Sequence, residues 1–166
     1  MKSRRYLFIA AVLLMGLLAV PALHVDAQDN PLAGVTVEGL GAVQPAVAPG
    51  QTLQLLKLTL EPGTTISMHH HPGPVIISVA SGVFTTSFAQ STAVITRAGA
   101  AAEATPEPMG SGVEYTLNPG DTISYDASST GHVMKNEGSE PLVLFASVLF
   151  EDGQPGFIFE EGTPVS

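Results

Sequence analysis

The chain has 166 residues and contains no cysteine. It can therefore form no disulfide bond, and it has no thiolate that could act as a nucleophile or as a metal ligand. Zinc ribbons and thiol-dependent enzymes are excluded on this ground. If the protein binds a metal ion, imidazole and oxygen must supply the ligands.

The chain also contains few basic residues. Lys and Arg together number 6 against 15 Asp and Glu, which gives a formal net charge of −9 at pH 7. Such a chain repels phosphates, so we predict no nucleic-acid partner and no strongly anionic substrate. Charged residues make up only 13% of the chain and hydrophobic residues 45%, a composition that excludes a disordered acidic tail and a coiled coil.

The N-terminus has the pattern of an export signal. Three basic residues precede an uninterrupted apolar run over residues 6–20, and Val25-Asp26-Ala27 offers a small-residue cleavage site. The run is shorter than the roughly 20 residues that a membrane-spanning helix needs. We expect residues 1–27 to be a signal peptide, cleaved on export to a secreted or periplasmic, extracytoplasmic location without membrane attachment. An uncleaved N-terminal anchor is the alternative.

Cleavage would make the protein more acidic. It removes Lys2, Arg4, Arg5 and Asp26, so three positive charges and one negative charge are lost from −9, which leaves −11. The mature chain would keep only three basic residues, and its surface would repel anionic lipid headgroups.

We expect one domain after the signal peptide. Residues 28–50 mix Gly, Pro and Ala and are interpreted as an N-terminal arm. Residues 51–150 carry short strand-like segments, about every 8–12 residues, with turn signals between them and no amphipathic helix. This pattern is typical of an all-β sandwich or barrel. The acidic segment 151–166 is predicted to lie across the barrel as a C-terminal arm, docked by Phe157 and Phe159.

The expected strands cover residues 35–37, 52–60, 64–69, 75–80, 83–88, 92–97, 113–117, 122–125, 132–135 and 142–150. In the second of them the leucines switch from one alternating face to the other after Leu55, which predicts a β-bulge. Ser81-Gly82 predicts a tight hairpin between two neighbouring strands. Residues 98–112 are rich in small residues and proline and are expected to form a mobile loop, with a short Ala-rich helix as the alternative.

Four histidines follow the signal peptide, and three of them are consecutive: His69, His70 and His71. On an extended strand His69 and His71 share one face and His70 faces away, unless a twist of the strand turns it inward. Two imidazoles at this spacing can reach one ion at roughly 2.0–2.2 Å. An antiparallel barrel can bring His132 alongside from a distant strand. From the residues alone, satisfied core histidines, an exposed run without function and loose surface binding of metal remain alternatives.

Two segments resemble the motifs of the cupin family. Gly63, His69, His71 and Gly82 stand at the spacings of the glycine, two histidines and second glycine of the first cupin motif, and the family's glutamate falls on Val75. The resemblance covers roughly residues 50–150.

The second cupin motif is matched in its order but less closely. Pro119-Gly120-Asp121 resembles the turn that opens it, and His132 with Asn136 resembles its end. Between them Asp126 and two serines stand where Pro and Gly are usual, and the stretch before the histidine is one residue longer. Two motifs in the correct order are specific for the fold and much less so for the function.

The resemblance implies an all-β fold, the double-stranded β-helix or jelly-roll barrel of cupins, in a single domain. It also implies a divalent metal ion inside one mouth of the barrel, held by His69, His71 and His132. Because Val75 replaces the carboxylate ligand, the ion would keep a formal charge of +2 and act as a stronger Lewis acid. Three imidazoles suit Zn²⁺, Fe²⁺, Mn²⁺, Cu²⁺ or Ni²⁺ better than Mg²⁺ or Ca²⁺.

Three residues are candidates for lining a ligand pocket. Val75 occupies the position of the family's carboxylate, Met134 shares a strand face with His132, and the Tyr125 hydroxyl could donate to a bound ligand. Core packing is the alternative role for Met134 and Tyr125. No catalytic residue and no organic cofactor is assigned.

These features support three hypotheses. The first is an exported cupin that binds a divalent transition metal and a small-molecule ligand without turnover. The second is a metal-dependent dioxygenase or isomerase acting on a small organic substrate, against which stand the missing carboxylate and the lack of a second general base in either motif. The third is a metal-free structural cupin. By analogy with the family, a homodimer is compatible with all three.

Overall fold

The computed structural model describes residues 30–90, 93–101 and 103–159. The predicted signal peptide and residues 160–166 of the C-terminal arm lie outside these ranges. The regular secondary structure of the described residues consists of β-strands. These residues contain no helix that is long and apolar enough to span a membrane.

The described residues form twelve strands. Their bounds are β1 (Val35–Val43), β2 (Gln51–Leu60), β3 (Thr65–His70), β4 (Pro74–Ser81), β5 (Phe84–Phe88), β6 (Val94–Thr96), β7 (Glu107–Pro108), β8 (Glu114–Leu117), β9 (Thr122–Asp126), β10 (His132–Lys135), β11 (Leu142–Glu151) and β12 (Ile158–Phe159). Most strands begin and end near turns that contain Gly or Pro, residues that interrupt the ladder of backbone hydrogen bonds.

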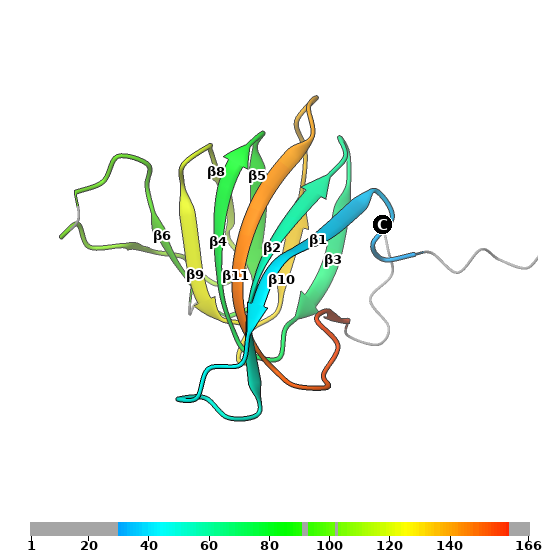
Figure 1. Ribbon diagram of the computed structural model, residues 1–166. Coiled ribbons are helices and arrows are strands. Elements are labelled where there is room, and N and C mark those ends of the chain that lie inside the picture. The colour runs from blue at the N-terminus through cyan, green and yellow to red at the C-terminus, as the bar shows by residue number, and fades with distance from the viewer. Residues whose placement is uncertain (1–29, 91–92, 102, 160–166) are drawn as a thin grey trace, which may run out of the picture.

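The strands form two sheets that face each other (Figure 1). The seven-stranded sheet has the order β1-β2-β11-β4-β9-β6-β7, and the five-stranded sheet has the order β12-β3-β10-β5-β8. From β2 to β6, and again from β7 to β12, each strand lies in the opposite sheet from the one before it. Antiparallel sheets connected in this way make a jelly roll, so the predicted all-β double-stranded β-helix is confirmed.

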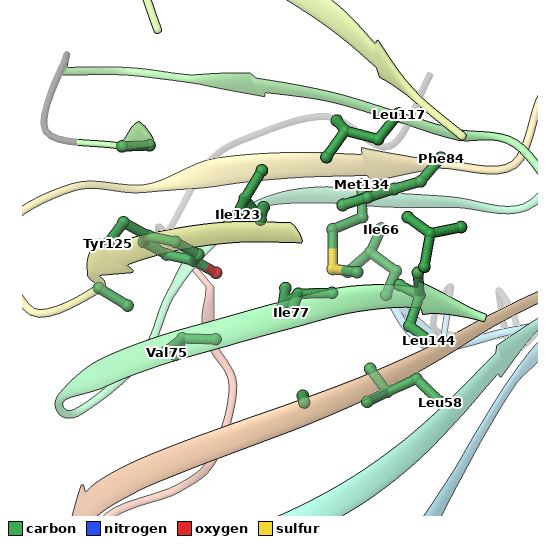
Figure 2. Packing of buried hydrophobic residues seen from close by; sticks show 14 of the residues in the cluster. Leu58, Ile66, Val75, Ile77, Phe84, Leu117, Ile123, Tyr125, Met134 and Leu144 are labelled. Atoms are coloured by element: carbon green, nitrogen blue, oxygen red, sulfur yellow. The ribbon is translucent and has the colours of Figure 1, made fainter. Parts of the chain in front are cut away.

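The hydrophobic core lies between the two sheets (Figure 2). Alternate residues of a strand face inward, and in β11 every second side chain from Leu142 to Phe150 is buried. The side chains with no exposed surface come from both sheets. They include Leu60, Ile66, Phe84, Leu117, Ile123, Leu142 and Leu144. This shared core holds β3 and β10, which carry the motif histidines, against the inner face of the larger sheet.

The leucine pattern of β2 does not reflect a bulge in this strand, and that prediction is wrong. β2 pairs with β11 in an unbroken register over its whole length. The register shift lies instead in β1, between Gly39 and Gly41. The leucines switch face because β2 is apolar on both sides: Leu53 and Leu55 are 40% and 45% exposed, whereas Leu58 is buried.

The turn at Ser81-Gly82 does not close a hairpin, and that prediction is also wrong. β4 and β5 belong to different sheets, so the turn carries the chain from one sheet to the other. Gly82 has a φ of +82°, and a Cβ atom there would lie 2.8 Å from Cα of Leu142. Glycine is required because the turn has a left-handed backbone and passes directly over β11. A turn signal indicates a reversal of the chain and not which strand becomes the neighbour.

The segment 98–112 is more ordered than predicted at its C-terminal end. β7 pairs with β6, and Met109 is 1% exposed. The expectation of an irregular loop is therefore wrong for residues 107–109, where one buried methionine anchors the segment to the core. The described part of this segment contains no helix.

Candidate metal centre

Three histidine side chains meet where β3 and β10 pair. His69 lies in β3, His71 follows two residues later, and His132 opens β10 directly opposite His69. The ring centroid of His69 is 4.9 Å from that of His71 and 4.4 Å from that of His132. One nitrogen atom from each ring lies within 4.8 Å of the other two. Strand alternation and antiparallel pairing together produce this cluster.

His70 is not part of the group. It pairs with Ile158 of β12 and lines a shallow surface pocket with Gln90 and Ser129. Strand alternation places its ring on the face opposite to that of its two neighbours, as the sequence predicted. His70 is therefore a natural control position for the three clustered histidines.

The three clustered imidazoles are buried and neutral. His69 and His132 have no exposed surface, and His71 is 6% exposed. Burial lowers the pKa of His69 to about 3, with a further contribution from the neighbouring His71. Burial also lowers the pKa of His71, and it brings the pKa of His132 well below its usual range together with the nearby His69 and His71. At neutral pH no proton competes with a metal ion for these rings.

Backbone carbonyl groups determine where two of the rings carry their proton. The Nδ1–H of His69 donates to the carbonyl oxygen of Ser67 at 2.7 Å, and the Nδ1–H of His71 donates to that of Gly156. Because a neutral imidazole has a single N–H, both rings have a lone pair at Nε2. The Nε2 atom of His69 is buried without a hydrogen-bond partner. A carbonyl that accepts from the other ring nitrogen is the usual support of a metal-bound histidine.

His132 completes the group with a different set of neighbours. Its Nε2 lies 3.1 Å from Nε2 of His71 and 3.1 Å from the hydroxyl of Tyr125, and its Nδ1 is buried without a partner. Two nitrogens that bind one Zn²⁺ at about 2.0–2.1 Å with a tetrahedral angle lie about 3.3 Å apart. The observed spacing suits a hydrogen bond and needs little change to suit a shared ion. The residues present therefore fit a divalent transition metal.

We expect the His132 ring to change tautomer when a metal ion binds. In the metal-free protein its Nε2–H donates to Nε2 of His71, whereas binding needs a lone pair at Nε2 and moves the proton to Nδ1. The Tyr125 hydroxyl cannot donate to Nε2 in either state, because this atom carries a proton in the first state and would bind the metal in the second. Proton–nitrogen correlation spectra of the imidazole rings, with and without Zn²⁺, measure this change. A His132 ring that keeps its Nε2 proton in zinc-loaded protein would contradict the ligand set.

The C-terminal arm covers the histidines. It leaves the end of β11 and returns along β3, where Phe159 of β12 lies opposite His69 (Figure 1). The ring centroid of Phe157 is 5.2 Å from those of both His69 and His71. These are the contacts expected of the arm's docking side chains. Together with the carbonyl of Gly156, they make the arm one wall of the site.

Val75, Tyr125 and Met134 all face the interior of the barrel (Figure 2). Val75 and Tyr125 are cross-strand neighbours on β4 and β9. The Tyr125 hydroxyl lies beside His132, and burial raises the pKa of this phenol well above its usual range. Val75 and Met134 line a cavity that His71 also lines. The three pocket candidates are thus divided: Tyr125 contacts the cluster, and the other two line the space beside it.

Four residues at the site were not identified from the sequence. Ser67 and Gly156 act through their carbonyl groups, which have no residue signature that a pattern could reveal. Phe88 stacks on His132 with ring centroids 5.3 Å apart, and Phe150 stacks on His71 at 5.5 Å. Both phenylalanines stand in predicted strands, a signal that places them in the core without showing that they pack on the histidines.

Comparisons with known proteins found structural similarity only. No family model and no curated protein matches the chain. The Cupin_2 domain of an XRE family transcriptional regulator from Enterobacter cloacae is 15% identical, with a TM-score of 0.46 over 69% of this chain and 95% of that one. A cupin 2 domain-containing protein from Halorhodospira halophila is 14% identical, with a TM-score of 0.48 over 78% and 72%. KdgF from Halomonas sp. is 16% identical, with a TM-score of 0.48 over 72% and 83%. These similarities are structural only, and the jelly-roll fold rests on the order of the strands in the two sheets.

Proposed function

We propose that this is an exported cupin-fold protein that binds a divalent transition metal ion through His69, His71 and His132, and a small-molecule ligand beside it. The orientation of His69 and His71 carries the proposal, since each holds a lone pair at Nε2 by donating its Nδ1–H to a backbone carbonyl. When bound, the metal would supply a Lewis acid that polarises an oxygen atom of the ligand. Export is proposed from the N-terminal pattern of the sequence.

The metal content of the purified protein tests this proposal directly. Incubation with Zn²⁺, Fe²⁺, Mn²⁺, Cu²⁺ or Ni²⁺ followed by dialysis is expected to leave about one ion per chain for at least one of these metals. The His69→Ala/His71→Ala variant loses two of the three ligands and is expected to retain almost none. His70→Ala is the matched control and keeps the wild-type content, because its ring lies outside the group. Equal and negligible metal in the wild type and the double variant would overturn the proposal.

Binding without turnover is favoured over an enzyme by the groups around the cluster. Among the described residues, no Asp or Glu joins the three histidines in a potential metal-ligand group. Burial raises the pKa of Tyr125, which keeps this hydroxyl protonated and makes it a hydrogen-bond donor rather than a general base. The dioxygenase or isomerase therefore stays the second candidate.

A further inference from the structure

A cavity of about 430 Å³ lies inside the barrel next to the histidine cluster. His71 and Phe157 form part of its wall, together with Val37 of β1 and Met134 of β10. The remaining wall comes from β2, β4 and β11 and from the segment that follows β11. Its volume falls within the range of about 300–1,000 Å³ that is common for small-molecule sites. A ligand in this cavity would reach the cluster from the His71 side.

The interior of the cavity is apolar. The side chains of Leu58, Val75, Ile77, Met134 and Val148 line it, and all five are at most 5% exposed to solvent. A charged group placed against this lining would lose its hydration without gaining a partner, which is unfavourable. The deep part of the cavity therefore selects for an uncharged apolar body.

Apart from His71, the polar side chains that line the cavity are partly or fully exposed and mark its entrance. Thr52 and Gln54 of β2, together with Gln154, supply uncharged hydrogen-bonding groups, and Glu151 and Asp152 supply carboxylates. Asp152 accepts hydrogen bonds from Thr52 at 2.6 Å and from Gln44 at 3.1 Å, and both donors are neutral. The entrance therefore keeps its negative charge.

Among the residues that the structure describes, no Lys or Arg lines the cavity. The described basic residues are all paired with carboxylates elsewhere: Lys57 with Glu38, Arg97 with Glu107 and Asp121, and Lys135 with Glu114. An anionic ligand would have to pass two carboxylates and would meet no cationic side chain inside. Charge therefore excludes carboxylates, sulfonates and phosphates at this entrance.

We propose that this cavity binds an uncharged, mostly apolar small molecule, with the carboxylates of Glu151 and Asp152 excluding anions. The inference deepens the proposed function by naming the class of ligand. It rests on the proposed function only for what the bound molecule does at the cluster, because occupation of the cavity needs no metal.

A matched pair of fluorescent probes tests the inference. N-phenylnaphthylamine is uncharged and fluoresces strongly in apolar surroundings, and anilinonaphthalene sulfonate has the same ring system with an added sulfonate. We expect the mature wild-type protein, titrated in the presence of EDTA, to bind the uncharged probe at least about tenfold more tightly than the sulfonate. Equal affinities, or binding of neither probe, would overturn the inference.

Two substitutions on adjacent residues of β11 locate the bound probe. Ala146 faces the cavity and Ser147 lies on the outer face of the same strand. Ala146→Leu fills the cavity and is expected to weaken binding of the uncharged probe about tenfold, whereas Ser147→Leu leaves it unchanged. Thermal unfolding confirms that both variants are folded. A probe that is insensitive to Ala146→Leu, or that is displaced by Ser147→Leu, would place binding on the outer surface and overturn the inference.

A third variant tests the role of the entrance charge. Glu151→Gln removes one carboxylate while keeping the size of the side chain, and it is expected to raise the affinity for the sulfonate several-fold without changing that for the uncharged probe. An unchanged ratio of the two affinities would contradict charge exclusion. The probe titrations use metal-free protein, so their result does not depend on metal binding. If the purified protein retains no metal but binds the uncharged probe, the proposed function is rejected and this inference stands. If the protein retains metal but binds neither probe, this inference is rejected and the proposed metal site stands.

Discussion

The metal-free protein is expected to lose several kcal/mol of unfolding free energy when the pH falls from 7 to 5. Histidines in the unfolded chain take up a proton as the pH drops through about 6.5. In the folded protein burial lowers the pKa of His69 to about 3, so this ring stays neutral over the whole interval. The unfolded state then binds more protons than the folded state, and stability decreases as the pH decreases.

The size of this loss of stability can be calculated for His69. A pKa of about 6.5 in the unfolded chain and about 3 in the folded protein corresponds to a loss of about 2 kcal/mol between pH 7 and pH 5. The pKa values of His71 and His132 are lowered by burial as well, so both rings add to the loss in the same direction. The contribution of the neutral His69 ring to the unfolding free energy is fully present above about pH 6.5 and is lost progressively as the pH falls toward 3.

Urea unfolding at pH 7 and pH 5 in the presence of EDTA measures this difference. His70→Gln is the matched control and should keep the full pH dependence, since its ring lies outside the cluster. His69→Gln removes one titrating ring and should reduce the difference by about 2 kcal/mol. A wild-type difference smaller than about 1 kcal/mol would contradict a cluster of buried, neutral histidines.

Replacing Val75 by glutamate is expected to destabilise the metal-free protein by about 3 kcal/mol at neutral pH. Val75 is 3% exposed and lies between Tyr125 of β9 and Val148 of β11. The new carboxyl group would have no cationic partner there, so its pKa would be raised above that of an exposed glutamate. A carboxyl group with a raised pKa binds its proton more tightly in the folded state than in the unfolded state. The destabilisation caused by Val75→Glu therefore increases as the pH rises above about 4.3. This dependence is opposite in sign to that of the histidines.

A bound metal ion is expected to reverse this destabilisation. Val75→Glu would place a carboxylate where the resemblance to cupins implies a fourth ligand, so that it could neutralise part of the charge of an ion held by the three imidazoles. Zn²⁺, Mn²⁺ or Fe²⁺ should then raise the melting temperature of Val75→Glu by more than that of the wild type. Val75→Gln has a similar volume without the charge and should be destabilised with no such rescue. A Val75→Glu protein that none of these metals rescues would defeat the metal-site proposal.

Most of the strands could be predicted because their signals are local. Alternating apolar residues bounded by Gly and Pro placed the segments that became β3, β9, β10 and β11 to within one or two residues. The choice of neighbour could not be predicted in the same way. The hairpin predicted after β4 failed because β4 pairs with β9 and β11, which lie far away in the sequence, and not with the strand that follows it. The bulge predicted in β2 failed because the leucine pattern reflects a strand that is apolar on both faces, which the residues alone do not distinguish from a bulge.

The amino-acid sequence alone specified the ingredients of the site: no thiol, two histidines on one strand face, a third histidine in a second motif, and Val75 in place of a carboxylate. These are properties of residue type and spacing, and a linear pattern contains them. The folded chain added the carbonyls that orient His69 and His71, the two phenylalanines of the barrel that stack on the cluster, and the apolar cavity with its acidic entrance. These features arise where distant segments meet, and backbone carbonyls are the same in every residue, so only the packing of the two sheets could assign them.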